Sequence, residues 1–331
     1  MENHHKDSRE KKSLGISNKD KGKKHRKGKV ILTIIVCVVL LVIVWKIMRA
    51  TSSIPYSFEK IEAPITYSEE EKAMKAISLS YLVYGCEDAE DKVGTVREIL
   101  EKNTLGIIIE NFGLKRLNKA DPTTAVINTA DFVSNYVGNY RFLTDLTNKR
   151  CGFYGAAFCD DENKCIWISY SGTVSFTDVV ACVGFALVPG LSKQEKMAFE
   201  LMKTVMESDE VKNQSYSILL TGHSLGGALA TEVSLISGCE AITINGADGM
   251  AVDKIRSIQG EKLSAKNITN YMTSAKNGKT SFLDVVQRLM FIGSYKAVNY
   301  HIFSENGYTN DPHCAFSFLK CENGKYSVQE K

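Results

Sequence analysis

The segment Thr221–Ala230 holds the residues best suited to do chemistry. It reads Thr-Gly-His-Ser-Leu-Gly-Gly-Ala-Leu-Ala, with an apolar run before it and helix-forming residues after it. A nucleophile on a sharp strand-to-helix turn needs glycine where the strand and the helix crowd together, and Gly222 and Gly226 hold those two positions. The pattern predicts Ser224 as an exposed nucleophile. The backbone N–H of Leu225, at the start of the helix, would face a developing oxyanion.

A serine hydroxyl needs a base to accept its proton, and histidine is the usual base near neutral pH. Of six histidines, three lie in the N-terminal tail and His223 lies inside the turn itself, which leaves His301 and His313. His313 ends the turn-rich segment Asn310–His313, whereas His301 lies in the strand-like segment Val298–Phe303. We therefore predict His313 as the base and keep His301 as the alternative.

In enzymes with a serine nucleophile on a strand-to-helix turn, an aspartate orients the histidine base. This aspartate lies between the serine and the histidine in the chain. Four aspartates follow the serine: Asp248, Asp253, Asp284 and Asp311. Asp284 lies beyond the strand-like segment Asn267–Met272, where an α/β-hydrolase carries its acid. Asp253 begins an expected surface helix, and Asp311 is too close in sequence to the base. We predict Asp284 as the acid, with Asp248 as the alternative.

A second oxyanion donor usually comes from a loop after an earlier strand. The segment Tyr170–Thr173 follows the strand-like run Cys165–Ser169 and suits that place. The backbone N–H of Thr173 is therefore the predicted donor. A plain exit from a hairpin is the alternative interpretation of this segment.

Strands and helices alternate along the body of the chain. Ser68 and Glu71 form a capping-box pattern that predicts a helix start. Strands are expected at Phe153–Cys159, Cys165–Tyr170, Tyr216–Thr221, Ala241–Asn245 and Asn267–Met272, and helices at Val93–Lys102, Lys193–Ser208 and Ala228–Ile236. This alternation predicts an α/β fold of the α/β-hydrolase type, with a mostly parallel sheet flanked by helices.

The N-terminal end has a different character. Residues 1–29 carry eleven Lys and Arg against four Asp and Glu, and the run from Val30 to Trp45 is apolar except for Thr33. At about 1.5 Å per residue this stretch covers most of a hydrocarbon core of roughly 30 Å. The excess of positive charge before it predicts a single-pass anchor with a cytoplasmic N-terminus and an extracytoplasmic catalytic domain. A cleaved signal peptide is the alternative.

This division predicts four parts. They are a basic tail over 1–29, a transmembrane helix over 30–48, a linker over 49–66 and a catalytic domain over 67–331. Outside the tail, thirty basic residues face thirty-four acidic ones, so nothing predicts a nucleic-acid groove. The eight cysteines of the body show no metal-ligand spacing, and no cofactor is expected. A bridge between Cys159 and Cys165 and two unpaired strand cysteines are both open. No oligomeric state is predicted.

At these residues the chain resembles the class 3 (fungal-type) lipase family and its bacterial relatives. Three features match in order: Tyr-Ser-Gly-Thr at 170–173, where the family has an aromatic residue followed by Arg-Gly-Thr; a helix with Gln194 and Ala198; and the segment 221–230. The resemblance implies Ser224, Asp284 and His313 as a triad, with Thr173 and Leu225 as oxyanion donors. Ser171 in place of the family's arginine is a departure.

The resemblance also implies an apolar lid, for which Val179–Pro189 occupies the expected place; a buried core helix is the other interpretation. We expect a membrane-anchored serine hydrolase that cleaves carboxylic esters, with lipid acyl esters as substrates, through an acyl-enzyme. An acyltransferase or a peptidase would use the same triad. A surface protein that keeps the fold as a binding module is the non-enzyme alternative.

Overall fold

The computed structural model describes residues 36, 40, 43, 44, 47, 48, 51–61, 65–87, 89–102, 129–172, 190–260, 263–274, 298–304, 319–322 and 325–328. The chain divides into two compact units, Met1–Ser52 and Ser53–Lys331. In the first unit, the six described positions from 36 to 48 are all helical and exposed. Among the described residues no helix is both long and apolar enough to cross a bilayer. The span predicted over 30–48 lies mostly outside those residues and stays a prediction.

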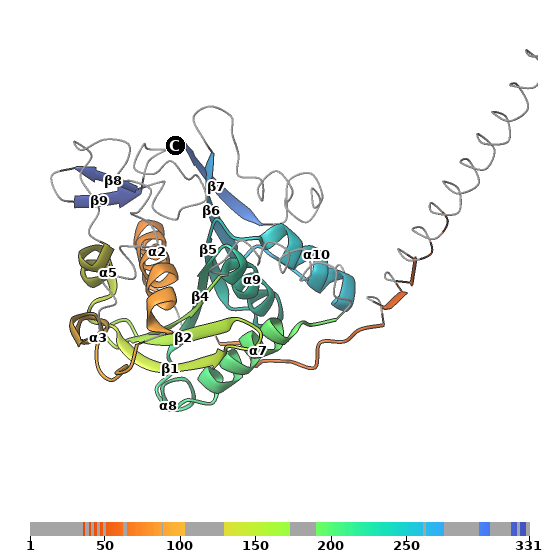
Figure 1. Ribbon diagram of the computed structural model, residues 1–331, viewed down its shortest axis with the longest axis horizontal. Helices are drawn as coiled ribbons and strands as arrows, with labels where there is room; N and C mark the ends of the chain where they lie inside the picture. The colour runs from red at the N-terminus through yellow and green to blue at the C-terminus, as the bar shows by residue number, and fades with distance from the viewer. Residues whose placement is uncertain are drawn as a thin grey trace, which may run out of the picture. The chain divides into compact units, whose positions relative to one another are not determined.

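The second unit is built on a sheet that contains, within the described residues, seven strands in the spatial order β1 to β7 (Figure 1). The first three strands are antiparallel neighbours, and β3 to β7 run parallel. Their bounds are β1 Arg141–Asn148, β2 Phe153–Asp160, β3 Cys165–Tyr170, β4 Ser217–His223, β5 Glu240–Ile244, β6 Ile268–Ser274 and β7 Asn299–Ser304. A separate hairpin pairs β8 (Leu319–Glu322) with β9 (Lys325–Val328). The predicted α/β fold with a mostly parallel sheet is confirmed.

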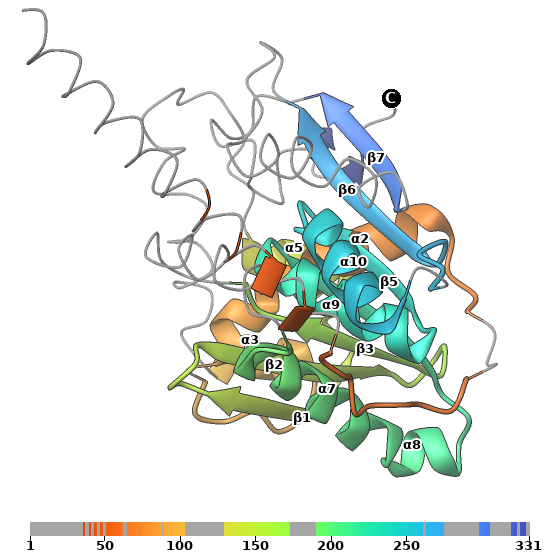
Figure 2. The same ribbon diagram turned by 90° about the vertical axis from the view of Figure 1, so that its right-hand side faces the viewer.

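Helices cover both faces of this sheet (Figures 1 and 2). The core of one face includes residues of α7 (Lys193–Met206), α9 (Leu225–Ser237) and α10 (Asp248–Gln259). The core of the other includes residues of α2 (Glu69–Cys86), α3 (Val96–Lys102) and α5 (Thr129–Val137). The short helix α8 (Asp209–Lys212) buries no residue. Because both faces are covered, β2 and β3 are buried along their whole length, and their side chains alternate between the two cores.

The long helix α2 packs against the sheet through apolar side chains such as Ile77, Leu79 and Leu82, with buried serines among them. Its start is fixed by the predicted capping box, in which Ser68 and Glu71 each cap the other's backbone N–H. Farther along, the hydroxyl of Ser80 pairs with that of Thr221 on β4 at 3.1 Å, and Ser169 of β3 donates to the Leu79 carbonyl at 3.0 Å. These buried hydroxyls are thereby satisfied, as buried polar groups must be.

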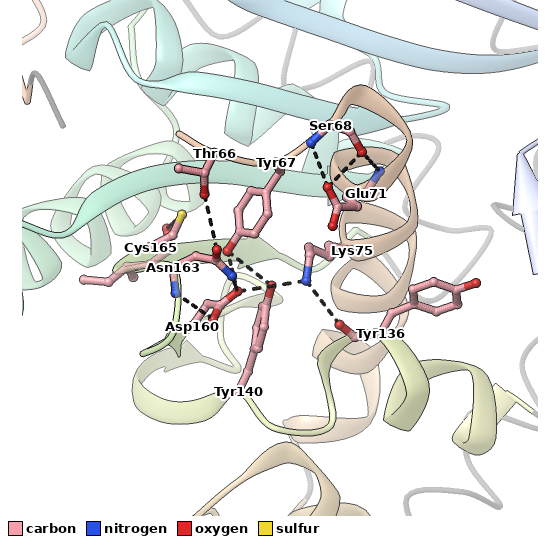
Figure 3. A network of polar contacts seen from close by, with 11 residues as sticks. Thr66, Tyr67, Ser68, Glu71, Lys75, Tyr136, Tyr140, Asp160, Asn163 and Cys165 are labelled. Carbon is pink, nitrogen blue, oxygen red and sulfur yellow. Dashed lines mark hydrogen bonds and ion pairs between the residues drawn. The ribbon is translucent and has the colours of Figure 1, made fainter. Parts of the chain in front are cut away.

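A polar network ties the first part of α2 to the turn between β2 and β3 (Figure 3). The hydroxyl of Tyr67 donates to Asp160 at 2.5 Å and lies 3.4 Å from the Tyr140 hydroxyl. The Lys75 ammonium lies 4.9 Å from the ring centroids of both tyrosines and 3.9 Å from Asp160. Burial lowers the pKa of Lys75, and the Asp160 carboxylate opposes that shift. The network lies at the edge of the sheet where β3 and β4 begin, opposite the edge where β4 ends in the serine turn.

Several elements differ from the sequence-based expectation. Strand β4 runs on to His223 and α9 begins at Leu225, so the glycines of the turn belong to regular elements, because tertiary packing overrides their low propensity. Helix α10 begins at Asp248, five residues before the expected Asp253, which is wrong as a helix start. The antiparallel strand β1 and the helix α5 were not predicted.

The cysteines of the hairpin do not form a bridge. In the register of β2 and β3, Cys159 pairs with Ile166 while Cys165 pairs with Asp160, so the two cysteines point to opposite faces of the sheet. Both are buried and free, and burial raises the pKa of each thiol to about 12. The interpretation as two unpaired strand cysteines is confirmed.

Part of the segment expected to be a linker packs within the second unit. Ile54 belongs to the core on the α7 side, and Tyr56 and Phe58 stack on Phe199 of α7. The Tyr56 hydroxyl also donates to Glu200 at 2.9 Å. Packed aromatic rings of this kind hold the start of the unit to α7 rather than leaving it as a free stalk.

A fully buried ion pair joins α7 to α10. The ammonium of Lys254 lies 2.5 Å from one carboxylate oxygen of Glu195 and 2.7 Å from the other, and both side chains are completely shielded from solvent. Glu195 also caps α7 by accepting from the backbone N–H of Ser192. The pair therefore fixes the start of α7 to the middle of α10.

We predict that Lys254→Met destabilises the protein by about 3–5 kcal/mol, because it leaves the Glu195 carboxylate buried and unpaired. The double variant Glu195→Gln with Lys254→Met should recover most of that loss, since no uncompensated charge remains. Urea unfolding followed by fluorescence measures both. If the double variant is no more stable than Lys254→Met, the loss comes from packing rather than from the charge.

Candidate active site

Ser224 occupies the sharp turn between β4 and α9 at the carboxyl edge of the sheet. Its backbone has φ 58° and ψ −121°, a conformation that residues other than glycine rarely adopt and that costs about 1–3 kcal/mol. The Ser224 N–H donates to the Ile244 carbonyl of β5 at 3.1 Å, and its own carbonyl accepts from the Ala247 N–H at 3.2 Å. The turn is thus held from β5, and the Ser224 side chain is only partly buried.

The flanking glycines are required by the close approach of three backbone segments. A Cβ on Gly222 would overlap the Gly226 backbone, and a Cβ on Gly226 would overlap the carbonyl oxygen of Tyr170 at the end of β3. The crowding inferred from the sequence is therefore present. Leu225 is the first residue of α9, so its N–H has no acceptor within the helix, and its role as an oxyanion donor stays a prediction.

The end of β3 brings the predicted oxyanion segment beside the serine. The Cα of Gly172 lies so close that an added Cβ would be 3.4 Å from the Ser224 Cβ and would also strike the carbonyl of His223. Ser171, the departure from the family pattern, donates its hydroxyl to the Tyr154 carbonyl at 3.0 Å and so holds β3 to β2. Thr173 follows directly but lies outside the described residues.

Tyr84, near the end of α2, joins the oxyanion segment to the serine turn. Its hydroxyl accepts from the Gly172 N–H at 2.9 Å and lies 3.3 Å from Nδ1 of His223. The centroid of the His223 ring also lies 6.3 Å from those of Tyr81 and Tyr84. His223 is therefore held by α2. Sequence reasoning missed Tyr84, although its spacing of three from Tyr81 puts both on one face of the helix.

The alternative acid, Asp248, lies in the interior beneath the serine turn. Its side chain is fully buried, and Oδ2 accepts from the Thr243 hydroxyl at 2.6 Å. Burial raises the pKa of this carboxyl to about 7, and the nearby polar side chains of Thr243, Thr231 and Asn270 oppose that rise. Among the described residues, no histidine contacts the Asp248 carboxyl.

The other predicted site residues are placed as follows. His301 lies in β7, as its strand-like surroundings indicated, opposite Tyr271 of β6 in the sheet register. Asp284, His313 and the lid segment Val179–Pro189 lie outside the described residues and stay predictions. Within the described residues no group of three or more His, Cys, Asp or Glu side chains is arranged to hold a metal ion.

The segment that forms this site matches a known family. Residues 137–292 match the model of the Tle-like phospholipase domain, which spans β1 to β6 and includes the serine turn. This part of the chain is therefore similar to a phospholipase-like family. The matched residues also include Asp284, whereas His313 and α2 lie beyond them.

Solved lipase structures are similar to this chain at low identity. Lipase II from Rhizopus niveus is 14% identical, with a TM-score of 0.37 over 62% of this chain and 71% of the lipase. The mono- and diacylglycerol lipase from Aspergillus oryzae is 14% identical, with a TM-score of 0.35 over 63% and 72%. Lip2 lipase from Yarrowia lipolytica is 17% identical, with a TM-score of 0.34 over 66% and 77%. No curated protein matches the chain.

We predict that Tyr84→Phe slows the reaction of Ser224 with a fluorophosphonate probe by about 10- to 100-fold, because the oxyanion segment loses the hydroxyl that holds Gly172. The rate of probe labelling under single-turnover conditions measures this. Tyr56→Phe is the matched control, since it also removes one hydrogen-bonded tyrosine hydroxyl but lies against α7, and it should label at the wild-type rate. Equal labelling rates for both variants would show that Tyr84 has no part in the site.

Proposed function

We propose that this protein hydrolyses carboxylic esters of lipids through a covalent acyl-enzyme on Ser224. The observation that carries the proposal is the serine turn itself. Ser224 is held at a positive φ at the start of α9, with the backbone of Gly172 packed against it. A strained, partly exposed serine between a helix start and a second backbone segment suits nucleophilic attack and oxyanion binding. The match to the Tle-like phospholipase domain favours a lipid ester as substrate.

In the proposed reaction the Ser224 oxygen attacks the ester carbonyl carbon while His313 accepts the hydroxyl proton. The carbonyl oxygen becomes an oxyanion, which the N–H groups of Leu225 and Thr173 bind. As the intermediate collapses, the C–O bond to the alcohol breaks and His313 gives its proton to the leaving oxygen. Water then attacks the acyl-enzyme by the same steps and releases the fatty acid. Asp284 orients the His313 ring and stabilises its charged form.

The same triad would serve acyl transfer to another alcohol, or peptide cleavage, because the fold does not fix the acceptor or the leaving group. A binding module without catalysis is the remaining alternative. Reaction with a fluorophosphonate separates this last class from the enzymes, since only an activated serine is phosphonylated at a useful rate.

We predict that wild-type protein is labelled by a fluorophosphonate and that Ser224→Ala abolishes labelling and ester hydrolysis. His313→Ala should lower kcat by about 10⁴ or more, since the nucleophile then has no base. Asp284→Asn should lower kcat by about 10⁴, because the histidine then adopts the wrong tautomer. Hydrolysis of a short p-nitrophenyl ester gives kcat. His301→Ala is the matched control for the base, and a loss there with full activity in His313→Ala would reverse the assignment.

Substrate class is resolved by comparing three substrates at equal ester concentration: a p-nitrophenyl ester, emulsified triacylglycerol and phospholipid vesicles. A lipid ester hydrolase releases fatty acid from at least one of the two lipids. Activity confined to the soluble ester would make the protein an esterase.

We further propose that residues 30–48 anchor the protein in a membrane with the N-terminus cytoplasmic. The support is the length of the apolar run and the eleven basic residues that precede it. The full-length protein should therefore sediment with membranes and resist carbonate, while a form that begins at Ser53 should stay in the supernatant. Full-length protein recovered in the supernatant would contradict the anchor.

A further inference from the structure

The carboxyl of Asp248 is buried, and no step of the proposed mechanism involves it. It is the first residue of α10, and it has no exposed surface. Oδ2 accepts from Thr243, whereas Oδ1 has no hydrogen-bond partner at normal distance. The hydroxyl oxygen of Thr231 on α9, which faces the same carboxyl, is likewise buried and unpartnered.

A short loop connects this carboxyl to the serine turn. Asp248 Oδ1 lies so close to Gly246 that a Cβ on this glycine would overlap it. The side-chain amide of Asn270 on β6 holds the same glycine, donating to the Gly246 carbonyl at 3.0 Å and accepting from its N–H at 3.3 Å. The next residue, Ala247, donates its N–H to the Ser224 carbonyl. Asp248 and Asn270 therefore position the loop that holds the strained serine.

The surroundings of Asp248 favour a neutral carboxyl. The groups that face it are Thr231 from α9, Thr243 from β5 and Asn270 from β6, and all three are uncharged. A carboxylate without a cation or several donors is costly to bury, so the protonated form is preferred. A protonated Oδ1 would also have a proton to donate, and the buried Thr231 hydroxyl, which has no other partner among the described residues, is the acceptor we infer for it. Burial accordingly raises the pKa of Asp248 to about 7.

We propose that Asp248 is a positioning residue for the serine turn, and that its protonated carboxyl, packed against Gly246, Thr243 and Thr231, keeps the loop 245–247 hydrogen-bonded to the Ser224 carbonyl. Ionisation of Asp248 loosens this loop and lowers the activity of Ser224. The kinetic test of this inference rests on the proposed hydrolase function. A second test, which measures stability, is independent of that function.

The kinetic test compares Asp248→Asn with the wild type, because asparagine has the shape and neutral charge of the protonated acid. Wild-type kcat/KM for a p-nitrophenyl ester should rise as the base loses its proton and then fall about fivefold or more between about pH 7 and about pH 9. Asp248→Asn should show the rise alone. Asp253→Asn, on the same helix but partly exposed, should keep the wild-type profile.

The stability test follows the unfolding midpoint in urea with pH. The folded-state pKa of Asp248 is raised above its unfolded value, so its contribution is fully present below about pH 4 and is lost as the pH rises to about 7. The wild type should lose stability over that window relative to Asp248→Asn, which should be the more stable protein at pH 8. Thr243→Val removes the donor to Oδ2, which should push the pKa higher and move the decline to higher pH.

The outcomes separate this inference from the proposed function. If Asp248→Asn lowers kcat about 10⁴-fold at every pH, as removal of a triad acid would, Asp248 is the acid and the inference is overturned. If its pH profile and stability curve match those of the wild type, Asp248 does not titrate in this range and the inference fails. If the wild type neither hydrolyses esters nor reacts with the fluorophosphonate, the hydrolase proposal fails, and the stability curves still decide the protonation of Asp248.

Discussion

The close approach of three backbone segments at Ser224 is the constraint on which the rest of the structure depends. Gly226 packs against the Tyr170 carbonyl, Gly222 against Gly226, and Gly172 against the serine itself. No side chain larger than hydrogen fits at these contacts, and the serine is forced to a positive φ. Such strain persists only when the surroundings over-determine it. Here β3 and β5 provide that support through backbone contacts and hydrogen bonds on either side of β4.

Helix α2 adds a further brace from the opposite face of the sheet. Residues near its start are fixed by the network of Tyr67, Lys75 and Asp160, and its other end carries Tyr84 to the oxyanion segment. Between these ends, apolar side chains and buried hydroxyls pack the helix against β3 and β4. Because α2 is held at both ends, its Tyr84 hydroxyl is in place to contact both Gly172 and His223.

The elements around Ser224 were largely predictable from the sequence, because there the local residue pattern agrees with the structure that packing requires. The apolar run before Ser224 and the helix formers after it predicted β4 and α9, and the strand-like runs Phe153–Cys159 and Cys165–Tyr170 predicted β2 and β3. Helix α10 was misplaced because its start was expected at Asp253, whereas the buried Asp248 is the first residue of the helix. Strand β1 was missed because its polar side chains, such as Thr144 and Asp145, belong to an edge strand that is only half buried.

The sequence by itself determined the turn at Ser224 and the α/β architecture, because the patterns for both lie in residues that are neighbours in the chain. Only the tertiary structure brought Tyr84 beside Gly172 and His223, and only it enclosed Asp248 between Thr231, Thr243 and Asn270. These groups are far apart in the sequence, and their contacts come from the order in which strands assemble into a sheet. The environment that makes Asp248 a neutral buried carboxyl is therefore a property of the fold, since the charge of a side chain depends on what surrounds it.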